Sequence, residues 1–473
     1  MKRKFSIVIG LILIFAGTTA AQNFNDVLRL AQPGVISSAR ALGMGNTYYA
    51  AGDDYTAAIF NPAGLGLLKR MEFNGSMNYN SFSSNTAFIN SSQEYSQSST
   101  DLNQIGFAFP LPTARGSLVF SLGYNQTKVF NKAVKFDAFN STNTSMAQFL
   151  TSLNDDIAYE LGLSYETDAG DQTIIDGNLN QSGTILQDGG INEWTFGGAI
   201  EVAQNTFFGA SLNVLSGTFT NNREYLEEDT RNLYQGLADQ NDIDTEDFLS
   251  FYLNDIIEQD LAGWNAKIGF LYKGEFTRFG FAIKFPTKYT VTDYYFVDGE
   301  GDFQYATFFL DPPIESEIEY DISTPYEFSG GVAVDLGELT ASADLTLIDY
   351  TQMEFSNGLD TRDRSEQNRL IKDIFTNVLN YNLGLEYDVP RSGIVLRGGF
   401  IYRPSAFKDD TSEYDRKYLT AGIGFQANKL FRFDVGYAYG WWEDFGDNYG
   451  TDVSRTFQEN TVNNLLFSVV YNF

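Results

Sequence analysis

The side chains that most enzymes use for catalysis are missing from this chain of 473 residues, which contains neither His nor Cys. An imidazole general base, a Ser-His-Asp triad, a thiolate nucleophile and a Cys-based zinc site are therefore excluded. Haem would have to be bound through Tyr or Met, because the chain has no His or Cys to serve as axial ligand. We predict that the chain is not an enzyme and that it holds no cofactor.

Acidic side chains are the remaining group that could bind a ligand. The chain has 61 Asp and Glu against 31 Lys and Arg, and its net charge is −30. No nucleic-acid partner is predicted, because binding phosphates requires a basic face. Residues 218–260 hold twelve acids and two bases, with the densest part at Asp239–Asp247. The order lacks the glycine and the spacing of an EF-hand loop. A solvated acidic surface is therefore favoured over a metal site, and calcium binding stays open.

The N-terminus has the three parts of a secretory signal peptide. Lys2, Arg3 and Lys4 form a basic start, residues 5–16 are apolar apart from Ser6 and Gly10, and small residues follow. We expect cleavage after Ala21, with Ala20 as the alternative. The apolar run is shorter than the ~20 residues that cross a bilayer as a helix. A short buried helix or an anchor is the other interpretation, and no second apolar run of sufficient length follows.

Alternation of apolar and polar residues runs through the rest of the chain. At the C-terminus Phe473, Tyr471, Val469 and Phe467 share one parity, and similar patterns recur upstream with charges opposite the aromatics. In a membrane barrel the apolar face meets lipid and the charges face the lumen. A terminal Phe on such a strand resembles the C-terminal assembly signal of Gram-negative outer-membrane proteins. Phe473 and Tyr471 are therefore expected to engage the barrel-assembly machinery.

These patterns predict an all-β fold, a 14-stranded antiparallel transmembrane β-barrel in the outer membrane. Short turns alternate with long loops, and an even number of strands suits a bacterial barrel with both ends on the short-turn side. The segment 156–166 also alternates, but a fifteenth strand would break this parity. The predicted strands span 70–80, 102–110, 115–129, 192–203, 205–217, 261–273, 276–296, 322–335, 338–354, 377–388, 392–404, 415–426, 429–442 and 461–473.

Some positions in the barrel and its loops suggest a route for a ligand. Pro286 lies inside a predicted strand, where its missing N–H indicates an edge or a bulge. It is a candidate for a lateral opening, and the alternative is that the strand leaves the membrane there. Residues 247–257 are expected to form an amphipathic helix over the barrel mouth. Aromatic side chains of the long loops are candidates for ligand access, with ordinary loop packing as the alternative: Phe136, Phe139, Phe149, Phe248, Phe251 and Tyr252.

Residues 22–69 precede the first strand, do not alternate and are rich in Gly and Ala. A barrel of this width needs something to fill its lumen, and a compact segment of small residues can do so. A phosphate loop at Gly43-x-Gly45 is excluded, because no strand precedes it and no Lys-Ser/Thr follows. The segment continues with Asp53-Asp54 and then with Asn61-Pro62-Ala63-Gly64-Leu65.

This order of motifs resembles the FadL/TodX family of outer-membrane transporters of hydrophobic compounds. The resemblance implies that residues 22–69 are an N-terminal plug, or hatch, and that Asn61, Pro62, Ala63 and Gly64 form its turn. Residues 70–473 would then be the barrel. FadL-like proteins have a lateral gap at the third strand, so Pro286 departs from the family. PorV-type proteins of a secretion system carry a similar opening motif.

The sequence therefore leaves two hypotheses for the function. The first is passive uptake of hydrophobic small molecules, such as long-chain fatty acids or aromatic compounds, from an outer membrane whose lipid surrounds the barrel. Such a channel needs an apolar pocket with few polar groups. The second is a PorV-type role in which the loops bind a secreted polypeptide. An apolar tunnel would favour the first, and a sealed barrel with an exposed loop patch would favour the second.

Overall fold

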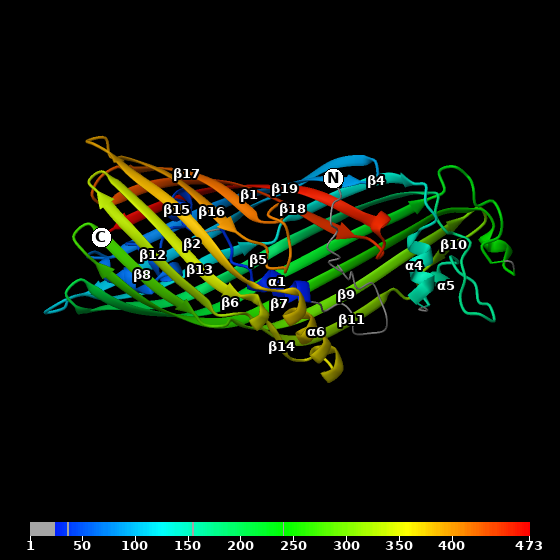
Figure 1. Cartoon of the computed structure of the whole chain (residues 1–473), viewed down its shortest axis with the longest axis horizontal. Coiled ribbons are helices and arrows are strands. Elements are labelled where there is room, and N and C mark those ends of the chain that lie inside the picture. The colour runs from blue at the N-terminus through cyan, green and yellow to red at the C-terminus, as the bar shows by residue number, and fades with distance from the viewer. Residues whose placement is uncertain (1–23, 36, 154–155, 240) are drawn as a thin grey trace.

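The computed structural model describes residues 24–35, 37–153, 156–239 and 241–473. The predicted signal peptide and its cleavage site at Ala21 lie outside the described residues. Figure 1 shows a barrel of tilted strands that holds the C-terminus at one end. At the other end the wall continues on one side into a long sheet that carries the helices α4 (Met146–Leu153) and α5 (Ile157–Glu160).

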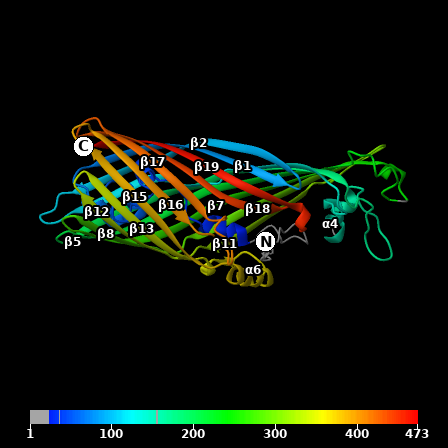
Figure 2. The ribbon, with the colours of Figure 1, turned by 45° about the horizontal axis from the view of Figure 1, so that its top comes forward.

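The strands form one closed antiparallel sheet of fourteen membrane spans, as predicted. The sheet closes between β1 (Glu72–Phe88) and β19 (Arg455–Asn472), where Phe73 lies opposite Tyr471. The two strands lie side by side in Figure 2. Four spans are each interrupted and count as two strands. They are β3 (Leu118–Val129) with β4 (Lys132–Asn140), β8 (Thr277–Lys284) with β9 (Lys288–Phe303), β11 (Ile314–Ser323) with β12 (Glu327–Leu336), and β13 (Leu339–Asp349) with β14 (Glu354–Asn357).

The other spans are continuous, and a short strand, β10 (Thr307–Phe309), pairs with β9 at the far end of the sheet. The continuous spans are β2 (Ser91–Leu111), β5 (Leu179–Ala203), β6 (Thr206–Glu228), β7 (Phe248–Lys273), β15 (Asn377–Val389), β16 (Ile394–Arg403), β17 (Arg416–Gln426) and β18 (Phe431–Asp447).

The lipid-facing band can be read along β7. Trp264, Ile268 and Tyr272 point outward and are exposed, whereas Lys267 between them is buried in the lumen. Outward Asp260 lies above Trp264, so the apolar band ends there. Trp264 and Tyr272 are eight positions apart, about 27 Å along the strand, a length comparable with the ~25 Å height of an outer-membrane apolar band. The prediction that aromatics face lipid and charges face the lumen is confirmed.

Several predicted loops are instead strands that continue above this band. We call residues 81–101, 130–191, 218–260, 297–321 and 443–460 the outer extension. β5, β6 and β7 have 25, 23 and 26 residues, far more than the ~9–11 that span the membrane. The predicted helix at 247–257 is wrong, because these residues belong to β7 and pair with β6 and β9. The segment 156–166 contains α5 and adds no strand.

A second hydrophobic core holds the outer extension together. It lies between β4, β5, β6, β7 and β9 on one side and α4 and α5 on the other. Glu227 is buried in it and accepts hydrogen bonds from the first backbone N–H of α4, Met146 N, at 2.6 Å. The loop between β14 and β15 contains a separate helix, α6 (Thr361–Ile374).

Residues 24–35 and 37–69 lie inside the barrel and form the plug. Its elements are α1 (Phe24–Ala31), α2 (Ala39–Gly43), α3 (Ala57–Phe60) and the 3₁₀ helix η1 (Pro62–Leu67). Small residues allow close backbone approach: a Cβ added to Gly399 would lie 2.4 Å from Gly45 N. The predicted plug is therefore confirmed as a filled lumen. Among the described residues, no helix has the length and apolar character needed to cross a membrane.

Candidate functional site: a cavity above the plug

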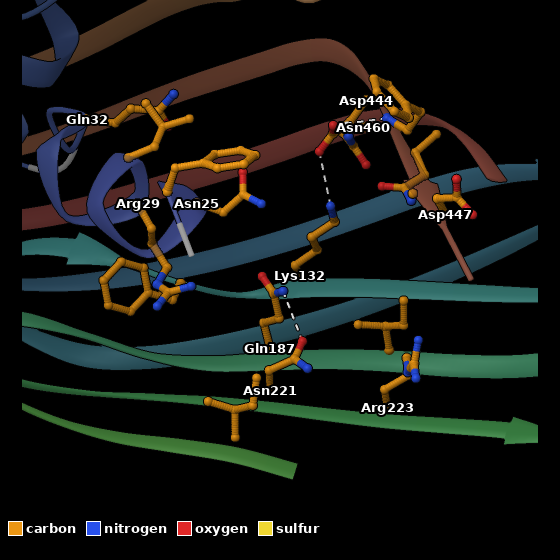
Figure 3. Close-up of a pocket in the computed structure, with 18 of the residues that line it drawn as sticks. Asn25, Arg29, Gln32, Lys132, Gln187, Asn221, Arg223, Asp444, Asp447 and Asn460 are labelled. Carbon is orange, nitrogen blue, oxygen red and sulfur yellow. Dashed lines mark hydrogen bonds and ion pairs between the residues drawn. The ribbon is translucent and has the colours of Figure 1, made fainter. Parts of the chain in front are cut away.

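A cavity of about 1530 Å³ lies above the plug, at the level where the outer extension begins (Figure 3). α1 forms part of its floor, and α6, β11, β16 and β18 contribute to its sides. Its apolar lining comes from segments far apart in sequence: Phe24, Leu28, Phe82, Phe130, Tyr350, Ile374, Phe407 and Trp442. The size and the aromatic lining suit a small hydrophobic ligand.

Three half-buried basic residues line the same cavity and form no ion pair among the described residues, Lys128, Arg403 and Arg416, and the exposed Lys408 is a fourth. Lys128 Nζ donates to the carbonyls of Arg29 at 3.1 Å and Leu30 at 2.5 Å. Arg403 donates to Pro33 O at 2.5 Å and Gly34 O at 3.0 Å.

Arg416 makes its contact with a ring instead, since its guanidinium carbon lies 5.0 Å from the centre of the Trp442 ring. Two other basic residues of the cavity are paired with carboxylates. Lys132 Nζ lies 3.0 Å from Asp444 Oδ2, and Arg223 Nε lies 2.5 Å from Asp255 Oδ2. The lining as a whole has eleven acidic and seven basic residues, but Lys128, Arg403 and Arg416 lie half-buried between its apolar walls without an ion pair among the described residues.

The cavity reaches an interruption in the barrel wall at the third span. The ladder between β2 and β3 ends at Gln104 opposite Asn125. Above this point β2 pairs only with β1, and β4 pairs only with β5. We call this line without backbone hydrogen bonds the third-span seam. Residues 128–132 border it and also line the cavity.

Side chains and the plug bridge the third-span seam. Asn131 Nδ2 donates to Ser99 Oγ at 3.0 Å, and Asn103 Nδ2 donates to Ser37 O of the plug. Gly34 packs directly on the bulge of β3, where an added Cβ would lie 1.7 Å from Thr127 O. Any larger residue at position 34 would force the plug or the wall to move.

The wall is closed at Pro286. This residue lies in the break between β8 and β9, but across the break Thr287 N donates to Thr324 Oγ1 at 2.9 Å and Thr324 N donates to Thr287 O at 3.0 Å. Pro286 does not line the cavity. The expectation of a lateral opening there is not supported. Trp264 lies beside Pro286 and marks the upper edge of the membrane band, which fits the alternative that the strand leaves the membrane there.

The six aromatic residues expected at a ligand-access site do not line the cavity. Phe136, Phe248 and Phe251 are fully buried in the second core. Phe149 packs against that core, and Arg231 lies 3.5 Å from the centre of the Phe139 ring. Five of the six lie on the paired strands β4 and β7, where Tyr252 is opposite Leu226 and Glu300, and Phe149 lies in α4. They therefore lie in the outer extension, away from the cavity lining.

The hatch residues form a buried turn against the wall. Asn61 Nδ2 donates to Tyr49 O at 2.7 Å and to Phe270 O at 3.0 Å, and its Oδ1 accepts from Ala63 N at 3.2 Å. Pro62 begins η1, where a missing N–H costs nothing. Gly64 fits where a Cβ would lie 2.5 Å from Gly52 O. This turn therefore joins the plug to β7.

The terminal aromatic residues lie at the barrel end opposite the cavity. Phe473 N donates to Met71 O at 2.9 Å, and the rings of Tyr471 and Phe473 are 4.6 Å apart. Among the described residues, no group of three acidic side chains is arranged to hold a metal ion. In the acidic segment, Asp239 and Asp242 instead cap local turns, with Asp239 Oδ1 accepting from Asn241 N at 2.8 Å.

The sequence alone does not single out Lys128, Arg403 or Arg416 as site residues. The one signal in the sequence is that each occupies a position of the alternating pattern that faces the lumen. Nothing in the sequence indicates that positions 128, 403 and 416 meet at one cavity, because this depends on the barrel's register and curvature.

Comparison with known proteins points to one group. A family model described as outer membrane protein transport protein (OMPP1/FadL/TodX) matches residues 20–473. A FadL homologue of Pseudomonas aeruginosa is similar in structure, with a TM-score of 0.57, 12% identity, and coverage of 92% of this chain and 98% of that chain. The toluene transporter TodX of Pseudomonas putida has a TM-score of 0.54 and 13% identity, with coverage of 93% and 99%. No curated protein matches this sequence.

Proposed function

Because this chain belongs to the OMPP1/FadL/TodX family of outer-membrane transport proteins, we propose that it takes up hydrophobic small molecules with an anionic head, such as long-chain fatty acids. The observation that carries this proposal is the cavity with apolar walls and three half-buried basic side chains that form no ion pair among the described residues. The family is one of transport proteins, and the chain contains no His or Cys for catalysis.

The three half-buried basic side chains favour an acid over a plain hydrocarbon. An aromatic hydrocarbon would gain from the apolar walls only, at roughly 25 cal/mol per Å² of apolar surface removed from water. A carboxylate would in addition bind Arg416, Arg403 or Lys128, and a hydrogen bond to a charged group contributes about 1.5–3 kcal/mol. Basic side chains with only backbone or ring contacts can take such a head without breaking an ion pair.

The third-span seam is the exit that we propose for the ligand. The plug fills the lumen below the cavity, so a direct path to the periplasm is blocked by buried residues. Lipid is also the better solvent for the tail, by about 0.8 kcal/mol per CH₂. The third-span seam borders the cavity and has no backbone ladder to break. It lies at the third strand, which is the place that the family resemblance implied.

The alternative of a PorV-type protein that binds secreted polypeptides gains no support from the family match or from the similar structures. The cavity also favours transport, because its aromatic lining is enclosed by the wall instead of lying on an outer loop surface. We do not carry the secretion role further.

The test compares uptake of oleate and toluene by cells that lack other channels for these compounds. Arg416→Gln removes a charge from the cavity without breaking a hydrogen bond to the plug. We expect oleate uptake at low concentration to fall roughly tenfold, the effect of about 1.4 kcal/mol, with toluene uptake unchanged. Lys417→Gln is the control, because its ammonium bonds Ser412 O outside the cavity. Equal loss of both substrates, or no loss of oleate uptake, would contradict the proposal.

A further inference from the structure

A second hollow lies on the outside of the barrel and does not join the cavity. It has a volume of about 740 Å³, and no residue lines both. We call it the outer crevice. Its lining is Trp264, Ala266, Phe285, Pro286, Lys288, Ser323, Thr324, Tyr326 and Gln352.

Two prolines produce the outer crevice. Pro286 separates β8 from β9, and Pro325 separates β11 from β12 on the neighbouring span. Neither can donate to a ladder, so both strands break at the same height. The bonds between Thr287 and Thr324 close the inner side of the break. The sheet is therefore intact towards the lumen and hollowed towards the membrane.

The outer crevice lies where the membrane meets the outer solution. Trp264 is 56% exposed, points away from the lumen and marks the upper edge of the apolar band. Below it Ile268 and Phe281 face lipid. Aromatic side chains at this height are the usual boundary of a membrane barrel. The molecules that reach this hollow are consequently those of the outer leaflet.

The lining has an apolar part and a cationic rim. Phe285 and Tyr326 form one wall, with ring centres 5.9 Å apart, and Trp264 lies among the same lining residues. Lys288 is at the rim, where its Nζ donates to Ser323 Oγ at 2.8 Å. It forms no ion pair among the described residues, although Asp321 and Glu354 lie on adjoining strands. Gln352 Oε1 accepts from Tyr326 N at 3.3 Å.

We propose that the outer crevice binds one phosphate-bearing lipid of the outer leaflet, with its acyl chain against Phe285 and Tyr326 and its phosphate on Lys288. A basic residue next to aromatic rings at the membrane boundary matches the two parts of such a lipid. The apolar wall needs a tail, because it faces away from water. Lys288 needs an anion, because no carboxylate neutralises it. This site is independent of the cavity and of the proposed transport.

Native mass spectrometry of the full-length protein after gentle detergent extraction tests the proposal, with purified lipid A added as the probe. The wild type should retain one lipid. Lys288→Gln should weaken retention about fivefold, the effect expected for one basic residue near a membrane surface. Trp264→Ala should also reduce it. Trp194→Ala is the matched control, because Trp194 is 49% exposed on the lipid face but does not line the outer crevice.

The folded state of each variant is checked by heat-modifiable migration, so that a loss of lipid is not confused with a loss of fold. Two further probes separate the sources of phosphate. Inorganic phosphate at the same concentration should not displace the lipid, and dephosphorylated lipid A should bind the wild type as weakly as lipid A binds Lys288→Gln. Retention by Lys288→Gln equal to that of the wild type, displacement by inorganic phosphate, or equal losses in Trp264→Ala and Trp194→Ala would overturn the proposal.

Discussion

Arg40 of the plug and Glu386 of β15 form a two-point ion pair, with Nε to Oε2 and Nη2 to Oε1 both at 2.9 Å. Glu386 also accepts from Arg397 at 2.7 Å, so one carboxylate joins the plug to the wall. On the plug, Arg40 Nη1 lies 2.6 Å from Asp53 Oδ1. The plug is therefore attached to the side of the barrel opposite the third-span seam by buried charges, and on the seam side by hydrogen bonds from single side chains.

Replacing Arg40 should loosen the plug. In Arg40→Gln the carboxylates of Asp53 and Glu386 lose a buried partner, and breaking a buried ion pair in this way costs about 3–5 kcal/mol. We expect the barrel to remain folded and the conductance of single channels in planar bilayers to rise. Lys429→Gln, on an exposed turn, is the control and should leave conductance unchanged. Unaltered conductance in Arg40→Gln would show that these charges do not hold the plug.

Acid should have the same effect as the Arg40 variant. Burial alone would raise the pKa of Asp53, but Arg40 and Arg278 outweigh burial and hold that pKa below its ordinary value. A carboxyl group with a lowered pKa stabilises the folded state above its unfolded pKa of about 3.9 and loses this effect as the pH falls through the folded value. Conductance should stay constant from pH 7 to about pH 4 and rise in stronger acid. A rise that is already complete at pH 5 would assign the effect to another group.

The third-span seam can be tested by closing it. Because the chain has no Cys, Ser99→Cys and Asn131→Cys together place the only two thiols on its two sides, where the native side chains are 3.0 Å apart. A short thiol-reactive cross-linker should reduce oleate uptake in the double variant, and a reducible cross-linker should allow recovery after reduction. Each single variant, treated in the same way, is the control. Full uptake in the cross-linked protein would exclude the third-span seam as the exit.

Phe473 should affect assembly more than stability. It donates a hydrogen bond to the Met71 carbonyl and packs on the Tyr471 ring, whereas the ladder between β1 and β19 starts one residue earlier. Deleting Phe473 or introducing Phe473→Asp should lower the amount of folded, heat-modifiable protein in the outer membrane. Phe431→Ala is the matched control, since Phe431 packs on Tyr471 at 4.6 Å but is not terminal. Wild-type levels of folded protein in both Phe473 variants would show that this residue is not an assembly signal.

The sequence predicted the membrane part of the barrel well, because lipid requires the same alternation in every span. Phe431, Arg432 and Phe433 show the pattern plainly, with the rings outside and the guanidinium inside. Above the membrane this requirement ends. Residues 91–101 of β2 are almost all polar. They pair with β1 as a strand, but their sequence shows no alternation of apolar and polar residues that would predict one. The long strands were therefore predicted as loops.

The candidate site was less predictable than the fold. The order of motifs around Asn61 pointed to a plug, but Lys128, Arg403 and Arg416 meet only because the barrel brings the third, eleventh and twelfth spans around one space. The strand pattern points to Pro286 but not to Pro325, although the outer crevice depends on both prolines lying at the same height. The two prolines lie on adjacent spans but are thirty-nine positions apart in the sequence, and sequence patterns alone do not align them.

β7 continues for sixteen residues above Trp264, a length of about 50 Å along the strand. The tip of the protein therefore stands well above the apolar band. Residues 218–260 and 297–321 hold twenty acidic residues and two basic ones. A molecule that approaches the membrane from this side would meet these acidic residues before the apolar band, and an anionic one would be repelled by them at low salt.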